Sequence, residues 1–489
     1  MAAFVFYLAT MGTILCGSML LPALIAFGTG ETETGVRILL YGAVGGFFCT
    51  ATLLAILGRV RGLRRNTAIL LGITSWCFFP LVAAIPISDL ANLSFFDALF
   101  QTVSAFTTTG SLIFENVETV PSSVLFLLAQ FQWLGGFATL VTLILVLAPW
   151  EIGGLPQVAS ASVAASIVAS QRRLINFCSK LLQTYLFLTI ICFVFLLMAG
   201  VSPYNAIKFA YGALSTGGVF TASEGVDLLL GTSGMFIMAL FFLVGATSVF
   251  WHQSIYRLDG IEILKHKESY YVLAAFAILA LYIAYLLAEA AGSSSFLSSS
   301  FTLAEGFFNA ASVVSTSGIQ SRPGVFALLP ETIVLLGIFI GGGCYSTAGG
   351  VKFFRIGGMC TLAQHELNRL IYPNIMRTDR YGTAEHDMQF MKAMWSLFAV
   401  VIATLAVATG ALSYSGLAFQ PAFTAAVSAL SNAGPIYGSF WSDGSVVAWP
   451  DYYEMSLLQK EILTITMFLG RLEVIAVFAS FSVFLRAIR

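Results

Sequence analysis

Long apolar stretches alternate with short polar ones along almost the whole chain of 489 residues. Each stretch is close to the roughly 20 residues that a helix needs to cross a bilayer. The first stretch lacks a basic start and a small-residue cleavage site, so we interpret it as a retained helix, not a signal peptide. We therefore expect ten membrane spans, at residues 3–27, 36–58, 67–87, 122–148, 177–200, 230–255, 270–290, 326–356, 390–414 and 455–485.

Composition supports a membrane protein. Hydrophobic residues make up 58% of the chain and charged residues only 10%, whereas a soluble domain carries about 25% charged residues. The net charge of -1 argues against a nucleic-acid partner. Seven cysteines without a CxxC pair and four scattered histidines predict neither a disulfide framework nor a metal centre. Membrane lipid is the expected surrounding.

Basic residues gather on one side of the predicted membrane. That side holds 18 of the 23 lysines and arginines, including the segment RVRGLRR at 59–65. The positive-inside rule makes this side cytoplasmic and places both termini there. The opposite loops are acidic, and acidic loops either concentrate cations or simply solvate the surface. The sequence favours neither explanation.

Four short apolar segments on the acidic side share one motif: SAFTTTG at 104–110, GALSTGG at 212–218, SVVSTSG at 312–318 and SALSNAG at 428–434. Their final glycines are separated by 108, 100 and 116 residues. Each segment lies between two full spans, so the unit is span, short segment, span. Repetition of this kind predicts copies packed around an axis. The segments end in Thr107, Thr108, Thr109 and Gly110; in Ser215, Thr216, Gly217 and Gly218; in Ser315, Thr316, Ser317 and Gly318; and in Ser431, Asn432, Ala433 and Gly434.

Three of the copies share a predicted helix start sixteen residues before the glycine. An N-cap hydroxyl and an acceptor three residues later form a capping box in Ser94 with Asp97, Ser202 with Asn205, and Thr302 with Glu305. Pro203 falls at the first helical position, which suits proline. The fourth copy has Ala418 and Pro421 at these positions, so its start must be capped in another way.

A helix of about ten residues is only about 15 Å long and cannot cross hydrocarbon about 30 Å thick. Non-helical backbone at membrane depth is tolerated only where it lines a buried or water-filled cavity. The Thr/Ser/Gly ends are therefore expected to meet at a pore, where carbonyl oxygens and the negative ends of helix dipoles face a cation. Tight turns in an ordinary helical bundle are the alternative, which four copies in register disfavour.

The third repeat carries the run GGGCYSTAGG at 341–350 inside a long apolar span. Glycine at this density predicts a broken helix near the membrane midplane. Tyr345 stands where a small residue is expected, and it either reaches a hydroxyl partner across the pore or fills a gap between helices. Packing is the favoured role.

Two charges within apolar segments need an explanation. Arg471 lies deep in the last span, where a charge costs about 2.5–3.5 kcal/mol. It either controls the pore electrostatically, holding the 341–350 loop, or forms a structural ion pair with an acid; Glu473 is badly placed because residues two apart do not face each other on a helix. Lys208, in the second short segment, is expected to reach the surface or pair with an acid.

Together with the motifs QWLGG at 132–136, STAGGVK at 346–352 and GRLE at 470–473, the four segments resemble the Trk/Ktr/HKT superfamily of potassium uptake proteins, specifically its TrkH branch. The resemblance covers essentially the whole chain. It implies an all-α membrane protein with four span–pore-helix–span repeats in pseudo-fourfold arrangement plus two N-terminal spans. The expected divisions are 1–62 for the additional spans, 63–155, 156–262 and 263–370 for repeats 1 to 3, with a broken second span in repeat 3, and 371–489 for repeat 4.

The resemblance also implies a channel-like pore for potassium uptake with a filter glycine from each repeat. Glycine at the first position, Gly110 here, goes with potassium in that family. Potassium is then the substrate, held at Thr108, Thr109, Gly110, Thr216, Gly217, Gly218, Thr316, Ser317, Gly318, Asn432, Ala433 and Gly434. The loop of repeat 3 obstructs the path in the family, so the expected gate comprises Gly341, Gly342, Gly343, Tyr345, Ser346, Thr347, Gly349, Gly350, Lys352 and Arg471.

The family's proteins are homodimers that bind a cytoplasmic ring of nucleotide-sensing regulatory subunits. The resemblance thus implies a multi-pass protein of the bacterial inner membrane, without a cofactor of its own, and affected by nucleotide only through this partner. We expect the segment 352–392 to be the docking surface. An ion-coupled secondary transporter, by symport of sodium or protons, is the alternative function. An enzyme is not expected, because no cluster of an acid, a base and a nucleophile is evident.

Overall fold

The structure is a computed structural model that describes residues 2–56, 65–147, 170–218, 225–290, 300–371, 380–381, 384–385, 388–440 and 449–474. Within these residues the chain is almost entirely helical, apart from the two-residue strands β1 (Arg380–Tyr381) and β2 (Ala384–Glu385). Most of the RVRGLRR segment, the divisions expected at 62/63 and 155/156, and the last span beyond residue 474 lie outside the described residues.

Eight of the described helical segments are long and apolar enough to cross a membrane. The first combines α1 (Ala2–Ser18) with α2 (Leu20–Gly28). The others are α3 (Thr32–Ile56), α4 (Arg65–Leu90), α6 (Ser122–Thr142) continued by η2 (Leu143–Leu147), α8 (Gln171–Met198), α10 (Val226–Ala246), α13 (Lys267–Ala290) and α17 (Met388–Tyr414). These segments confirm eight of the ten expected spans and make the chain a multi-pass membrane protein.

The eighth and tenth expected spans differ from simple helices. Residues 326–356 divide into η5 (Phe326–Leu328), α15 (Glu331–Ile340) and the start of α16 (Phe353–Ile371). The non-helical residues 341–352 between α15 and α16 confirm the predicted break. The tenth span is described only as α19 (Leu457–Arg471) and the residues just after it.

The sixth span is confirmed, but its expected bounds of 230–255 were wrong. Helix α10 ends at Ala246, and α11 (Val249–Tyr256) begins after two non-helical residues, Thr247 and Ser248. The break has its cause in a distant segment, because the amides of Gly343 and Thr347 donate to the carbonyls of Ala246 and Gly245. The short helix α12 (Gly260–Lys265) then leads to α13.

Four short helices occupy the places of the repeated segments: α5 (Phe95–Phe106), α9 (Pro203–Ser215), α14 (Ser300–Val314) and α18 (Phe419–Leu430). Ser94 caps α5 and accepts from the amide of Asp97, as predicted. Ser202 is the N-cap of α9 but makes no side-chain cap bond. Helix α14 begins two residues before Thr302, so the N-cap prediction there was wrong. Short 3-10 turns η1 (Val117–Thr119) and η6 (Gly434–Phe440) lie in the connections.

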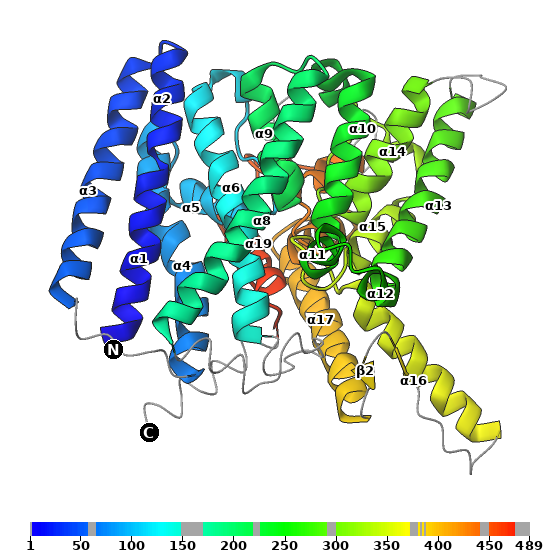
Figure 1. Cartoon of the computed structure of the whole chain (residues 1–489). Coiled ribbons are helices and arrows are strands. Elements are labelled where there is room, and N and C mark those ends of the chain that lie inside the picture. Colours follow the sequence, from blue (N-terminus) through cyan, green and yellow to red (C-terminus); the bar gives the residue numbers. More distant parts are fainter. Residues whose placement is uncertain are drawn as a thin grey trace.

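The helices differ in how deeply they lie in the protein. In the most apolar stretch of α6, 72% of the residues are buried, against 6% in that of α3. Helix α3 therefore faces lipid, whereas α6 lies in the interior, and Figure 1 shows α1, α2 and α3 at one edge of the bundle. Glu31, between α2 and α3, accepts from the amides of Ser122 and Ser123 and thus caps α6. This bond docks the two additional spans onto repeat 1.

Helix α16 projects beyond the body of the bundle in Figure 1, on the side where α3 ends and α17 begins. Its far end carries the exposed side chains Leu367, Leu370 and Ile371. This is the side on which the sequence places most basic residues. The far end of α16 thus extends away from the spans (Figure 1), whereas its first residues, such as Phe354 and Arg355, are buried against them.

Candidate ion pathway

The four glycine-bearing turns meet at one place in the fold. Each turn contacts the next, so that the copies form a closed ring in chain order. The contacts are seen where a methyl group added to one glycine would meet another copy. Such a methyl group would lie 2.4 Å from the nitrogen of Gly218 at Gly110, 3.2 Å from the oxygen of Ala433 at Gly318 and 2.4 Å from the nitrogen of Ser111 at Gly434. At Gly218 it would lie 3.0 Å from the oxygen of Ser317 in copy 3 and 2.2 Å from the ring of Pro435, which follows the turn of copy 4. The structure therefore brings all four predicted segments together.

The four turns also share one unusual backbone conformation. The residue two before each glycine is left-handed, with φ of 58° at Thr108, 52° at Thr216, 61° at Thr316 and 54° at Asn432. Threonine is rare in this region because its branched Cβ crowds the backbone. Strain of this kind persists only where surrounding structure enforces it, and it clusters at functional sites. Nothing in the sequence predicted that these four residues share a left-handed conformation.

The ring is fourfold only approximately. Gly110 and Gly318 have positive φ, at 79° and 71°, whereas the glycines of copies 2 and 4 do not. Copies 1 and 3 also share a hydroxyl pair, 2.8 Å between Thr107 and Thr109 and 3.0 Å between Ser315 and Ser317. Copies 2 and 4 have Gly217 and Ala433 in the second of these positions and lack the hydroxyl. The site thus has alternating pairs of turns.

Copies 1 and 4, which are neighbours in the ring, are joined by hydrogen bonds. The amide of Gly434 donates to the carbonyl oxygen of Thr109 at 2.7 Å. The Asn432 side-chain amide donates to Thr109 Oγ1 at 3.0 Å and to the carbonyl of Met467, also at 3.0 Å. Asn432 therefore fastens its own turn both to copy 1 and to α19.

Glycines on the second spans of units 1 and 4 let these spans touch the ends of short helices. A methyl group at Gly135 would lie 1.9 Å from the carbonyl oxygen of Phe106, and one at Gly470 would lie 2.0 Å from that of Leu430. These contacts give the QWLGG and GRLE motifs a structural reason. Gln132 of the first motif lies directly against Gly217.

The loop 341–352 lies directly against the ends of these turns. The Gly349 amide donates to Thr316 Oγ1 at 2.7 Å, and a methyl group there would lie 1.9 Å from the carbonyl oxygen of Ser431. The Thr347 hydroxyl donates to the carbonyl of Leu214 at 2.7 Å. The loop thus contacts copies 2, 3 and 4 at the start of their Thr/Ser/Gly ends.

Within the loop the backbone is tightly folded. Gly341 and Gly350 have φ of 72° and 76°, and Tyr345 has φ of 56°. The amide of Lys352 donates to the carbonyl of Ile340 at 2.7 Å, and its ammonium group donates to the carbonyl of Ala348. Glycine adopts a left-handed φ without steric cost, so the backbone at position 345 favours a smaller residue than Tyr345.

Arg471 connects this loop to the opposite side of the ring. Its Nε donates to Thr139 Oγ1 at 2.7 Å and its Nη1 to the carbonyl of Thr347 at 2.9 Å. Both acceptors are neutral oxygens, so the arrangement differs from the ion pair considered above. Glu473 pairs instead with Arg355, at 2.6 Å. Arg471 is buried. Its bond to Thr347 holds the loop, which is the first of the two roles considered for it.

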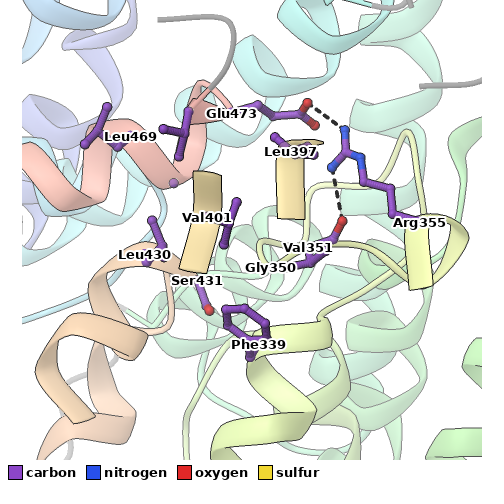
Figure 2. Close-up of a pocket in the computed structure, with 12 residues that line it drawn as sticks. Phe339, Gly350, Val351, Arg355, Leu397, Val401, Leu430, Ser431, Leu469 and Glu473 are labelled. Carbon is purple, nitrogen blue, oxygen red and sulfur yellow. Dashed lines mark hydrogen bonds and ion pairs between the residues drawn. The ribbon is translucent and has the colours of Figure 1, made fainter. Parts of the chain in front are cut away.

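A small cavity of about 30 Å³ lies beside the loop. Figure 2 shows its wall, where Arg355 reaches both Glu473 and the carbonyl oxygen of Val351, and where Gly350 and Ser431 also contribute. This volume suffices for a water molecule. One Glu473 oxygen is buried without a protein hydrogen bond, which suits a water there.

Two side chains singled out from the sequence have packing roles. Tyr345 is buried with its ring against Phe250, centroids 5.4 Å apart, which is the packing contact favoured above. Lys208 is also buried, which contradicts the first of its two expected roles, reaching the surface. Its ammonium group lies 4.7 Å from the centre of the Tyr204 ring, a cation–π contact.

Oxygen atoms dominate the site. The turns present backbone carbonyls and the hydroxyls of threonine and serine, which are hard ligands suited to alkali cations and poor ligands for transition metals. In the described ranges, no group of three or more His, Cys, Asp or Glu side chains is placed to hold a metal ion. The chemistry available here is the exchange of a hydration shell for protein oxygens.

Residues 63–487 match the family model described as "TrkH: Cation transport protein". The chain belongs to the TrkH family. Because the members of this family are cation transport proteins, the prediction that the chain is a transporter and no enzyme is confirmed, and so is the resemblance to the TrkH branch.

Relatives of the TrkH family match over most of their length. The Trk system potassium uptake protein TrkH of Salmonella typhimurium is 26% identical over 483 residues, 96% of each chain. The protein TrkG of Escherichia coli K12, also of a Trk potassium uptake system, is 26% identical over 86% of each chain. The crystal structure of the potassium transporter TrkH from Vibrio parahaemolyticus superposes with a TM-score of 0.82 and 24% identity, covering 98% of each chain. This likeness confirms the all-α membrane fold.

Proposed function

We propose that this TrkH-family protein takes up potassium through a channel-like pore whose filter is the ring of four glycine turns. One observation carries the proposal. The four turns share a left-handed residue two positions before Gly110, Gly218, Gly318 and Gly434, and each turn contacts the next in chain order. The names of the relatives as potassium uptake proteins point to the same ion.

In this proposal potassium sheds its water and is held by oxygens of residues 108–110, 216–218, 316–318 and 432–434. The C-terminal ends of α5, α9, α14 and α18 point at the ring, and each adds about half a negative charge. The uncrowded backbone at the glycines lets the carbonyls approach the ion. Transport requires no protein-bound cofactor, because the ion is the substrate.

The loop 341–352 acts as the gate. Its support is the direct contact of Gly349 with copies 3 and 4 and of Thr347 with copy 2. Arg471 stabilises the closed position through the carbonyl of Thr347. Conduction then requires these bonds to break, so that the loop leaves the ends of the turns.

The four units correspond to the proposed repeats at 63–155, 156–262, 263–370 and 371–489, after two additional spans in 1–62. By the positive-inside rule, the side that carries most basic residues is cytoplasmic in this proposal, and both termini lie on it. We place the protein in the bacterial inner membrane.

The protein acts as a homodimer with a cytoplasmic, nucleotide-binding ring subunit docked on residues 352–392. The exposed apolar end of α16, at Leu367 and Leu370, supports a protein contact there. Light scattering of the purified protein and copurification with the ring subunit test both points. Alanine at both leucines is expected to abolish copurification while the dimer remains; a monomer, or capture unchanged by these substitutions, contradicts this assignment.

Flux from liposomes tests the transport function. The purified protein should pass potassium, or its tracer rubidium, at least about tenfold faster than sodium, which corresponds to about 1.4 kcal/mol, and no neutral solute. A channel-like pore passes potassium down its own gradient without sodium or protons in cotransport. Uptake that strictly requires either co-ion supports the alternative, a secondary transporter, and equal passage of neutral solutes contradicts both.

A further inference from the structure

We propose that Glu268 is a positioning residue that latches the loop 341–352 to the start of α16 and so holds the loop in its closed position. This inference rests on the gating part of the proposed function. Glu268 is the second residue of α13 and is buried. It belongs to none of the motifs that mark the filter or the loop.

The side chain of Glu268 makes two bonds to the loop region. Its Oε1 atom accepts from the amide of Cys344 at 2.7 Å and from the amide of Phe354 at 3.1 Å. Cys344 lies early in the loop, whereas Phe354 lies in the first turn of α16. A single carboxyl oxygen therefore joins the beginning of the loop to the helix that follows it.

Both amides need such an acceptor. The Phe354 amide is one of the first donors of α16, which has no partner within its own helix, and the Cys344 amide is buried in non-helical backbone. A buried amide that loses its partner costs about 1–3 kcal/mol. A carboxyl group at a helix N-terminus is further stabilised by the helix dipole. Removing the Glu268 side chain therefore destabilises the closed loop specifically.

Other contacts show why this position controls the loop. On the neighbouring wall, the loop is held by backbone bonds, from the Gly343 amide to Ala246 and from the Val249 amide to Tyr345. Gly343 lies beside the Glu268 carboxyl group: a methyl group added to Gly343 would lie 3.4 Å from it. Residues 343–345 of the loop are thus held on two sides. Glu268 of α13 binds them on one side, and the residues at the break between α10 and α11 bind them on the other.

Thiol labelling of the full-length protein tests the latch without relying on transport. Cys344 and Cys192 are both buried, Cys344 in the loop and Cys192 on α8, whereas Cys77 and Cys360 are exposed. Glu268→Ala is expected to raise the rate of maleimide modification of Cys344 at least about tenfold, measured by peptide mass spectrometry. Cys192 should stay protected and Cys360 unchanged. The same variant should raise basal potassium flux without lowering the potassium-to-sodium ratio.

Two variants control this experiment. Glu268→Gln keeps an acceptor oxygen and should label within about threefold of the unmodified protein. Glu289→Ala removes an exposed acid at the other end of α13 and should change nothing. Unchanged Cys344 labelling in Glu268→Ala, equal exposure of Cys192, or a Glu268→Gln variant that behaves like alanine overturns the latch. A protein that labels as expected but passes no potassium would instead contradict the transport function.

Discussion

Gly110→Ser is expected to lower the potassium-to-sodium flux ratio at least about tenfold, because left-handed strain and steric displacement cost of order 1–3 kcal/mol. Gly110 has φ of 79°, and an added Cβ would lie 2.4 Å from the nitrogen of Gly218. The clash involves backbone, so neither side can move away cheaply. The turns of copies 1 and 2 must separate, and the oxygens around the ion then no longer match potassium. Liposome flux with each ion in turn measures the ratio.

Gly410→Ser is the matched control for this substitution. Gly410 lies in α17, where an added Cβ would meet no atom within 4 Å. The control should therefore retain the ratio of the unmodified protein. A Gly110→Ser protein with unchanged selectivity would mean that the contact between copies 1 and 2 does not shape the ion site.

Gly349→Ala is expected to raise basal potassium flux about tenfold or more, by destabilising the closed loop by at least about 1.4 kcal/mol. An added methyl group would lie 1.9 Å from the carbonyl oxygen of Ser431. The loop therefore cannot keep its contact with the end of copy 4. Flux is measured without any regulatory subunit, so that only the loop's own equilibrium contributes.

Gly343→Ala provides the comparison within the same loop. An added Cβ there would meet its nearest neighbours, the Ala246 oxygen and the Glu268 carboxyl, at 3.4 Å, an ordinary contact. This variant should keep the low basal flux. If Gly349→Ala lowered flux, or if both variants raised it equally, the loop would not close the pathway by its contact with Ser431.

The sequence predicted the features that depend on composition and repetition. Apolar length predicted eight of the spans, and the repeated Thr/Ser/Gly motif predicted four turns that the structure brings together. The density of glycine between 341 and 350 predicted the break in repeat 3. Span length and glycine content can be read from neighbouring residues, and the motif can be read from its repetition along the chain.

The missed features arise from contacts between distant segments. The break at Thr247 and Ser248 follows from hydrogen bonds to the loop about a hundred residues later, and nothing in the local sequence marks it. Arg471 binds neutral oxygens of two other repeats, and Glu473 finds Arg355. The left-handed residues before the glycines carry ordinary side chains, so their conformation is imposed by the assembled ring.

Heavy-atom diffraction gives the most direct test of the central claim, that backbone and hydroxyl oxygens from all four turns bind the transported ion. Crystals of the protein grown with thallium(I) in place of potassium should show anomalous density inside the ring formed by residues 108–110, 216–218, 316–318 and 432–434. Excess sodium should displace this density far less readily than potassium does. Anomalous density that lies elsewhere in the spans, with none among the four turns, would contradict the account.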